Sequence, residues 1–291
     1  MAEHHYVART YLRNWCLDRN KPRLQAYRKS DLKQFSPRPK DVCSEWDGDL
    51  NPNYFDNPSV LGDFRKIFEP KWKPTVERVG AGIINQEDKL VISLAWAHFF
   101  LCTPSQRAIT KDIYANEARA LALNVEIEHK HDFFKRLATK YLQKATWFLY
   151  NQDWIILLNE TEMPFITSDN PSAFVPESNP PERILPITPS LCLYAKTDMS
   201  LAEADHVDLG SPPKGSITFT KISRHDAMKI NRYTVISAND LVFSRSVDDV
   251  IAALVKEYCD VRPQVEPMRG SLPAENGTLK GATLTIRPRT I

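Results

Sequence analysis

The sequence contains little glycine, and this scarcity argues against several classes of nucleotide-dependent enzyme. Only nine of the 291 residues are glycine, and none falls in a Gly-x-x-x-x-Gly-Lys-Ser/Thr or Gly-x-Gly-x-x-Gly pattern. Loops of those types need glycine because their backbone approaches phosphate groups closely. The Gly-x-Ser-x-Gly turn of serine hydrolases is also missing. P-loop ATPases, the usual dinucleotide dehydrogenases and common serine hydrolases are therefore disfavoured.

Paired cysteines and long apolar runs are missing as well. The five cysteines are scattered and never form Cys-x-x-Cys, which argues against a disulfide framework and a structural zinc site. No apolar run approaches the ~20 residues that a membrane span needs. The first residues, MAEHHYVARTYL, lack the apolar core of a signal peptide. We therefore expect a cytoplasmic protein without a membrane partner.

Charge is nearly balanced overall but unevenly distributed. The formal net charge is +2, yet residues 1–40 hold ten basic residues against three acidic ones. A basic segment on an otherwise acidic chain indicates an anionic partner, with nucleic acid the first candidate. The alternative is that these basic residues are solvated or pair with nearby carboxylates.

Hydrophobic patterning predicts an α+β fold. We expect a single domain over residues 1–291, with a seam near residue 150 if there are two. The first half is expected to be rich in helix, with a short helix over 4–15 and a strand over 23–28. Further helices are expected from 59, although Pro70 and Pro74 interrupt the first, and over 87–101 and 104–147.

The second half is expected to hold a small mixed or antiparallel sheet with helices. Residues 154–158 and 164–167 are short β-rich runs joined by a polar loop, so a hairpin is predicted there. Helices are expected over 223–238 and 247–258, strands over 184–195 and at LVFS, and a terminal strand in ATLTIRP.

The stretch PFITSDNP carries the first candidate site. An apolar strand runs directly into Thr167, Ser168, Asp169 and Asn170 before Pro171. These residues favour a turn, and their side chains can cap backbone amides. Alternatively, the strand presents Asp169 as a metal-binding or general-base carboxylate.

A second candidate lies near the N-terminus. His4 and His5 precede Arg9 and Arg13 at a spacing that places all four on one side of a short helix. His5 is suited to proton transfer, and the two arginines are suited to holding phosphate. The alternative is that these are ordinary packed or surface residues.

Four segments resemble, in order, the motifs of domain-of-unknown-function family 4238, which is found mainly in bacteria. They are HHYVARTYLRNWC, PFITSDNP, ILPITPSLCL and KINRYTVISANDLVFS. The resemblance spans residues 4 to about 245 and implies no settled activity, cofactor or fold. Ala8 and Cys102 depart from it, because the family pattern has proline and arginine at these positions.

Carried over residue by residue, the resemblance implies special positions near the N-terminus and in the middle and later parts of the chain. They are His5, Tyr11, Leu12, Arg13, Glu69, Arg107, Ser168, Asp169, Asn170 and Asn231. A shared pocket for the N-terminal His/Arg motif and the PFITSDNP strand end would explain why both are polar.

The first functional hypothesis is a metal-dependent nuclease that hydrolyses phosphodiesters. Asp169 and Glu69 would hold Mg²⁺ or Mn²⁺, and His5 would transfer a proton. The substrate would be bound by six further residues: Arg9, Arg13, Arg107, Ser168, Asn170 and Asn231. The second hypothesis is a non-catalytic module that binds nucleic acid or protein through its basic first 40 residues. A role as a toxin or in phage defence is compatible with either.

Overall fold

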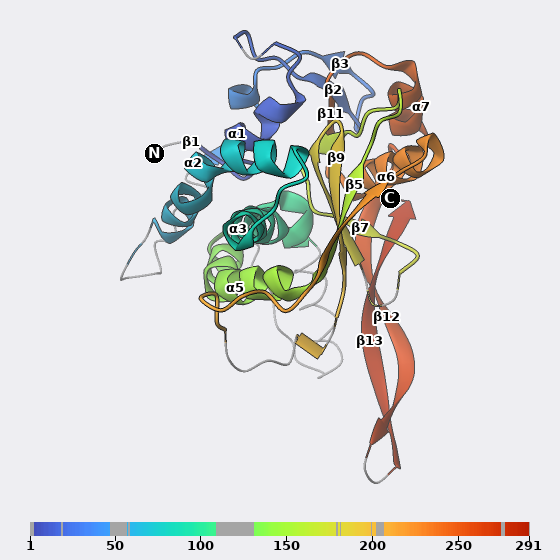
Figure 1. Cartoon of the computed structure of the whole chain (residues 1–291). Coiled ribbons are helices and arrows are strands. Elements are labelled where there is room, and N and C mark those ends of the chain that lie inside the picture. The colour runs from blue at the N-terminus through green and yellow to red at the C-terminus, as the bar shows by residue number, and fades with distance from the viewer. Residues whose placement is uncertain are drawn as a thin grey trace.

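Three long helices form one layer of the molecule: α2 (Val60–Gly80), α3 (Gln86–Cys102) and α5 (His131–Asn151). Figure 1 shows them stacked on one side of the strands, with the C-terminal helices on the other. The structure is a computed structural model. It describes residues 3–18, 20–46, 57, 59–108, 131–178, 180, 182–198, 200–201, 207–274 and 277–290.

The start of α3 is set by a capping box that also joins α3 to α2. The Asn85 side chain accepts the Asp88 N–H at 2.8 Å, and the Asp88 carboxylate accepts the Asn85 N–H at 3.1 Å. Arg78 of α2 donates to the same buried carboxylate at 2.5 Å. The expected interruption of α2 is wrong, because the helix continues through Pro70 and Pro74. Among the described residues, no helix is long and apolar enough to cross a membrane.

A five-stranded sheet packs against these helices. Its order is β10 (Ile217–Lys221), β5 (Asp153–Leu158), β9 (Leu191–Lys196), β8 (Glu182–Thr188) and β7 (Ala173–Val175). Only the β10–β5 pair is parallel. The predicted hairpin between 154–158 and 164–167 is therefore wrong, since β5 pairs with β9 and β10. Strand pairing depends on distant segments, which a local alternation pattern does not reveal.

The second sheet corrects the predicted distribution of elements. It has the order β3 (Gln34–Phe35), β2 (Gln25–Arg28), β11 (Leu241–Ser244) and β6 (Thr167–Ser168). A separate pair joins β1 (Glu3–His5) to β4 (Ser44–Trp46). The class is α+β as expected, but helices and strands are interspersed along the chain. The first 46 residues hold four strands, each too short to give a clear period.

The remaining elements connect these layers. Near the N-terminus they are α1 (Arg9–Leu12) and the 3₁₀ helices η1 (Arg13–Trp15) and η2 (Pro39–Asp41). Near the C-terminus they are α6 (Arg224–Ser237), α7 (Asp249–Glu257) and the hairpin of β12 (Val261–Ala274) and β13 (Gly277–Thr290). The hairpin projects from the body of the molecule (Figure 1). The predicted helices over 223–238 and 247–258 and the strand LVFS are confirmed. The domain seam near residue 150 stays a prediction.

A buried lysine caps α6 and ties it to the second sheet. The ammonium of Lys29, which directly follows β2, donates to the carbonyls of Val235 at 2.8 Å and Val261 at 2.7 Å. Cations are favourable at a helix C-terminus because the last carbonyl groups lack partners in the helix. Burial lowers the pKa of Lys29 to about 7. The turn that leads from α6 into β11 is therefore held from this side by hydrogen bonds from the Lys29 side chain.

Candidate functional site

Asp169 is buried, and its side chain binds backbone N–H groups. Its carboxylate accepts the N–H groups of Asn239 and Asp240 at 2.8 Å and of Leu241 at 2.9 Å. Burial raises the pKa of Asp169 to about 6, while these three hydrogen bonds act in the opposite direction. Both carboxylate oxygens are thus engaged in the turn between α6 and β11. This geometry gives Asp169 a structural role and no support as a metal ligand or base.

Ser168 and Asn170 are also engaged inside the protein. The Ser168 hydroxyl donates to the Asn170 carbonyl at 2.9 Å and accepts the Asn170 N–H at 3.1 Å. The Asn170 side chain donates to the Ser237 carbonyl at 2.8 Å and accepts from Thr103 at 3.1 Å. Both residues are fully buried, so the turn interpretation of PFITSDNP describes their contacts better than substrate binding does.

Asn231 bridges two backbone groups of the same segment. Its side-chain oxygen accepts the Ile166 N–H at 3.1 Å, and its amide donates to the Pro164 carbonyl at 2.9 Å. Asn231 is buried on α6, and its side chain supplies hydrogen-bond partners to backbone groups of the residues that precede β6. These contacts do not support its assignment to substrate binding.

Other predicted residues meet in an N-terminal network, defined here as His5, Glu45, Arg65, Glu69 and Arg107. Arg65 donates to the His5 carbonyl at 2.6 Å and lies 3.9 Å from the Glu69 carboxylate. Arg107 binds Glu45 through both of its terminal nitrogens, one at 2.9 Å. The β1–β4 pairing brings Ser44 opposite His5 and thereby joins the two halves. Arg65 thus links His5 to Glu69, and Arg107 is paired with Glu45. The shared pocket, which also requires Asp169, stays a prediction.

The place of Asp169 relative to this network is indicated by Tyr6, the residue after His5. Burial raises the pKa of Tyr6, and the charges of Cys43 and Asp169 add to the effect, which makes Asp169 an electrostatic neighbour of Tyr6. In the part of the chain that the structure describes, no group of three or more His, Cys, Asp or Glu residues is arranged to hold a metal ion. A Glu69–Asp169 metal pair therefore stays a prediction without geometric support.

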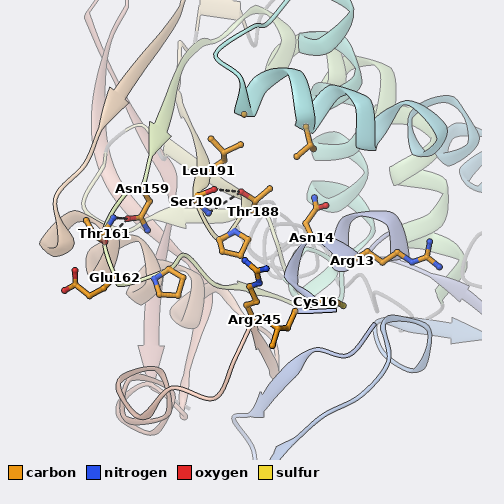
Figure 2. Close-up of a pocket in the computed structure, with 15 residues that line it drawn as sticks. Arg13, Asn14, Cys16, Asn159, Thr161, Glu162, Thr188, Ser190, Leu191 and Arg245 are labelled. Atoms are coloured by element: carbon orange, nitrogen blue, oxygen red, sulfur yellow. Dashed lines mark hydrogen bonds between the residues drawn. The ribbon is translucent and has the colours of Figure 1, made fainter. Parts of the chain in front are cut away.

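A cavity of about 530 Å³ lies elsewhere, and it brings the family-like segments together. Its lining includes Arg13 from the first segment and Pro164 from the second. Ser190 comes from the third segment, and Arg245 directly follows the fourth. We call this the Arg13–Arg245 cavity (Figure 2). Three of the segments and the residue that follows the fourth, spread over more than 230 residues, thus line one cavity.

Two guanidinium groups make the Arg13–Arg245 cavity basic. Arg13 and Arg245 are exposed, and neither forms an ion pair with another described residue. Glu162, which also lines the cavity, is neutralised by Arg224 at 2.9 Å. Figure 2 shows Arg245 extending toward the middle of the cavity, while Arg13 lies at the opposite rim and points away from it. Exposed side chains change rotamer rapidly, so Arg13 can swing inward.

The cavity separates Arg13 from the residues with which it was predicted to act. Arg13 was expected beside His5 and Arg9, but it lies on η1 at the rim of the cavity, while Arg9 is exposed on α1 and is not among the residues that line it. Arg245 was missed entirely. The only sequence signal for it is its place directly after LVFS, at the end of a strand.

Comparison with known proteins identifies a family. No curated protein and no solved structure matches the chain. The family described as protein of unknown function (DUF4238) matches residues 3–248, which include the four segments and every residue of the N-terminal network. Because this match covers most of the chain, the protein belongs to the DUF4238 family.

Proposed function

We propose that the protein binds a nucleotide-sized, phosphate-bearing ligand in the Arg13–Arg245 cavity. The observation that carries the proposal is the convergence on one cavity of three family-like segments and the residue that follows the fourth, with two arginines that form no ion pair with another described residue. Arginine suits phosphate because its planar fork of N–H donors can bind two oxygens at once.

The size and lining of the cavity support a small organic anion. Its volume of about 530 Å³ lies within the range of roughly 300–1,000 Å³ that is typical of small-molecule sites. Val76, Pro164 and Leu191 add apolar wall, against which a ring system can pack. Asn14 is held in place by its hydrogen bond to the Ile187 carbonyl at 3.1 Å. A nucleoside phosphate combines a ring with an anionic group and so fits both kinds of lining.

Calorimetric titration of the four ribonucleoside 5′-monophosphates tests the proposal, with adenosine and inorganic phosphate as partial ligands. We expect a monophosphate to bind more tightly than either part. Arg245→Gln should weaken binding about 10- to 100-fold, because a hydrogen bond to a charged group contributes roughly 1.5–3 kcal/mol. Arg38→Gln removes an equal charge outside the cavity and should change nothing. Unchanged affinity in Arg245→Gln would contradict the proposal.

A second candidate is the metal-dependent nuclease, for which one observation speaks: Arg65 links the backbone of His5 to the carboxylate of Glu69. His5, Glu69 and Arg107 supply an imidazole, a carboxylate and a guanidinium, which are the groups that phosphodiester hydrolysis uses. Incubation with DNA and RNA in Mg²⁺ or Mn²⁺ tests this activity. We expect cleavage to be lost in Glu69→Gln and retained in Glu257→Gln, an exposed control. Cleavage that survives Glu69→Gln would remove Glu69 from the mechanism.

Nucleic-acid binding by the basic first 40 residues is the related non-catalytic proposal. Two local pairs weaken it: Arg28 binds Asp31 at 3.2 Å, and Arg38 binds Asp41 at 2.8 Å. Salt-sensitive binding that charge reversal at Arg9, Arg13 and Arg23 abolishes would support it. Cytoplasmic location and a toxin or defence role belong with these proposals.

A further inference from the structure

Arg183 presents a guanidinium group that has no counter-charge among the described residues. It lies on β8, and its central carbon is 4.2 Å from the centroid of the Phe100 ring of α3. Both residues are half-buried, so Arg183 keeps part of its surface in contact with solvent. Stacking on an aromatic ring fixes the orientation of the guanidinium plane, and it leaves the N–H groups around the edge of that plane able to donate hydrogen bonds.

The hydrogen bonding of Arg183 is sparse for a group of this kind. One terminal nitrogen contacts the Ser172 hydroxyl at 3.5 Å, which is at the limit for a hydrogen bond. No carboxylate among the described residues lies within ion-pair distance of Arg183. Burial lowers the pKa of Arg183 to about 10, and no charged neighbour offsets this effect. A half-buried cation in this state is destabilised until an anion joins it.

The surroundings of Arg183 are rigid. The Ser172 hydroxyl oxygen accepts the indole N–H of Trp96 at 2.8 Å, so the serine is fixed to α3. Strand β8 is paired on both sides, with Phe174 of β7 and Ala195 of β9 opposite Arg183. The guanidinium therefore has a fixed base, and binding an anion there requires little ordering of the protein.

We propose that Arg183, held flat on Phe100, anchors a second anion site that binds an oxyanion, a phosphate or carboxylate group, at the free edge of its guanidinium. This site is separate from the Arg13–Arg245 cavity. Thr188, which lines that cavity, lies five residues further along β8, roughly 17 Å away at the usual rise of a strand. The inference does not depend on the function proposed for that cavity.

Thermal unfolding in the presence of inorganic phosphate or acetate tests the site. The measurements use an Arg13→Gln/Arg245→Gln background, so that the cavity does not contribute. We expect one of the two anions to raise Tm in a saturable manner when Arg183 is present. Arg183→Met should abolish this rise and should match or exceed the parent Tm without the anion, because an uncompensated charge has been removed. An equal rise in Arg183→Met, or no rise with either anion, would overturn the proposal.

A second measurement observes the Arg183 side chain directly. The ¹⁵N–¹H signal of the Arg183 Nε group is followed in the same background protein during the titration, with Arg183→Lys used to assign it. We expect this signal to shift with the same midpoint as Tm. A signal that stays unchanged at saturating phosphate and acetate would also overturn the proposal. The anion that causes the shift distinguishes a phosphate-bearing ligand from a carboxylate-bearing one.

Discussion

Tyr11 and Thr167 are 156 positions apart in the chain, yet their hydroxyl oxygens lie 2.6 Å from each other in the core. The Tyr11 hydroxyl donates its hydrogen to the Pro186 carbonyl at 2.5 Å, so Thr167 is the donor to Tyr11. One phenol therefore joins three of the four family-like segments. The Arg13–Arg245 cavity, which the same segments line, depends on this junction for the position of its walls.

Removing the Tyr11 hydroxyl should therefore destabilise the protein and perturb the cavity. We expect Tyr11→Phe to lower the free energy of unfolding by about 1–3 kcal/mol, because it leaves the Pro186 carbonyl and the Thr167 hydroxyl buried without this partner. Urea unfolding followed by circular dichroism measures the effect. Nucleotide binding should weaken in the same variant. A free energy of unfolding equal to that of the wild type would show that the junction contributes nothing.

Asp169 should be essential to stability and not replaceable by its amide. In Asp169→Asn, an NH₂ group replaces one of the two oxygens that accept the backbone N–H groups of residues 239–241. We expect a loss of about 2–4 kcal/mol, since buried donors are left without an acceptor. Asp260→Asn, at an exposed position, is the matched control. If both variants unfold alike in urea, Asp169 has no special structural role.

His98 should make the protein sensitive to acid. Its imidazole is fully buried between Phe68 and Phe99, and neither ring nitrogen has a hydrogen-bond partner among the described residues. Burial and the nearby charge of Arg65 lower its pKa from 6.5 to about 3. Below pH 6.5, His98 therefore binds a proton in the unfolded chain, whereas in the folded chain it stays neutral until the pH approaches 3. Stability should fall by roughly 1.4 kcal/mol per pH unit between pH 6 and 4 from this group alone.

The variant His98→Leu isolates that contribution. It removes the titrating group without breaking a hydrogen bond to a described residue. We expect its stability at pH 7 to stay within about 1.5 kcal/mol of the wild type, with a shallower decline on acidification. His225→Gln, an exposed position on α6, should keep the wild-type pH profile. An unchanged slope in His98→Leu would assign the acid sensitivity to other groups.

Gly215 should tolerate no side chain. A Cβ atom placed there would lie 2.0 Å from the Gln152 carbonyl oxygen. The buried ammonium of Lys89 also binds this strand junction, at 3.0 Å from the Gln152 oxygen and 2.8 Å from the Gly215 oxygen. We expect Gly215→Ala to cost at least about 2 kcal/mol, because backbone must move. Thermal unfolding of both variants measures the effect. Gly80→Ala is the control: its added methyl would lie 3.6 Å from Leu191, so its stability should stay close to that of the wild type.

Several elements could be predicted from the sequence because their signals are local. The helix α6 begins where Ser223 and Asp226 form a capping box, and α3 is apolar nearly all round, as a buried helix must be. The strand LVFS and the polar turn after PFIT follow from β propensity and from the turn preferences of Ser, Asp, Asn and Pro. The partner of each strand could not be predicted in this way. Strand β5 pairs with residues 191–196 and 217–221, and no local pattern in the sequence identifies these segments as its partners.

The sequence by itself determined the α+β class, the absence of glycine-rich phosphate loops and the polar end of the PFITSDNP strand. Only the tertiary structure decided which polar groups are left for a ligand. Asp169 is engaged because the turn of residues 239–241 presents three N–H groups to it, whereas Arg13 and Arg245 line a cavity and form no ion pair with another described residue. The reason is physical: the availability of a charge depends on what packs against it, and those neighbours come from segments far away in the chain.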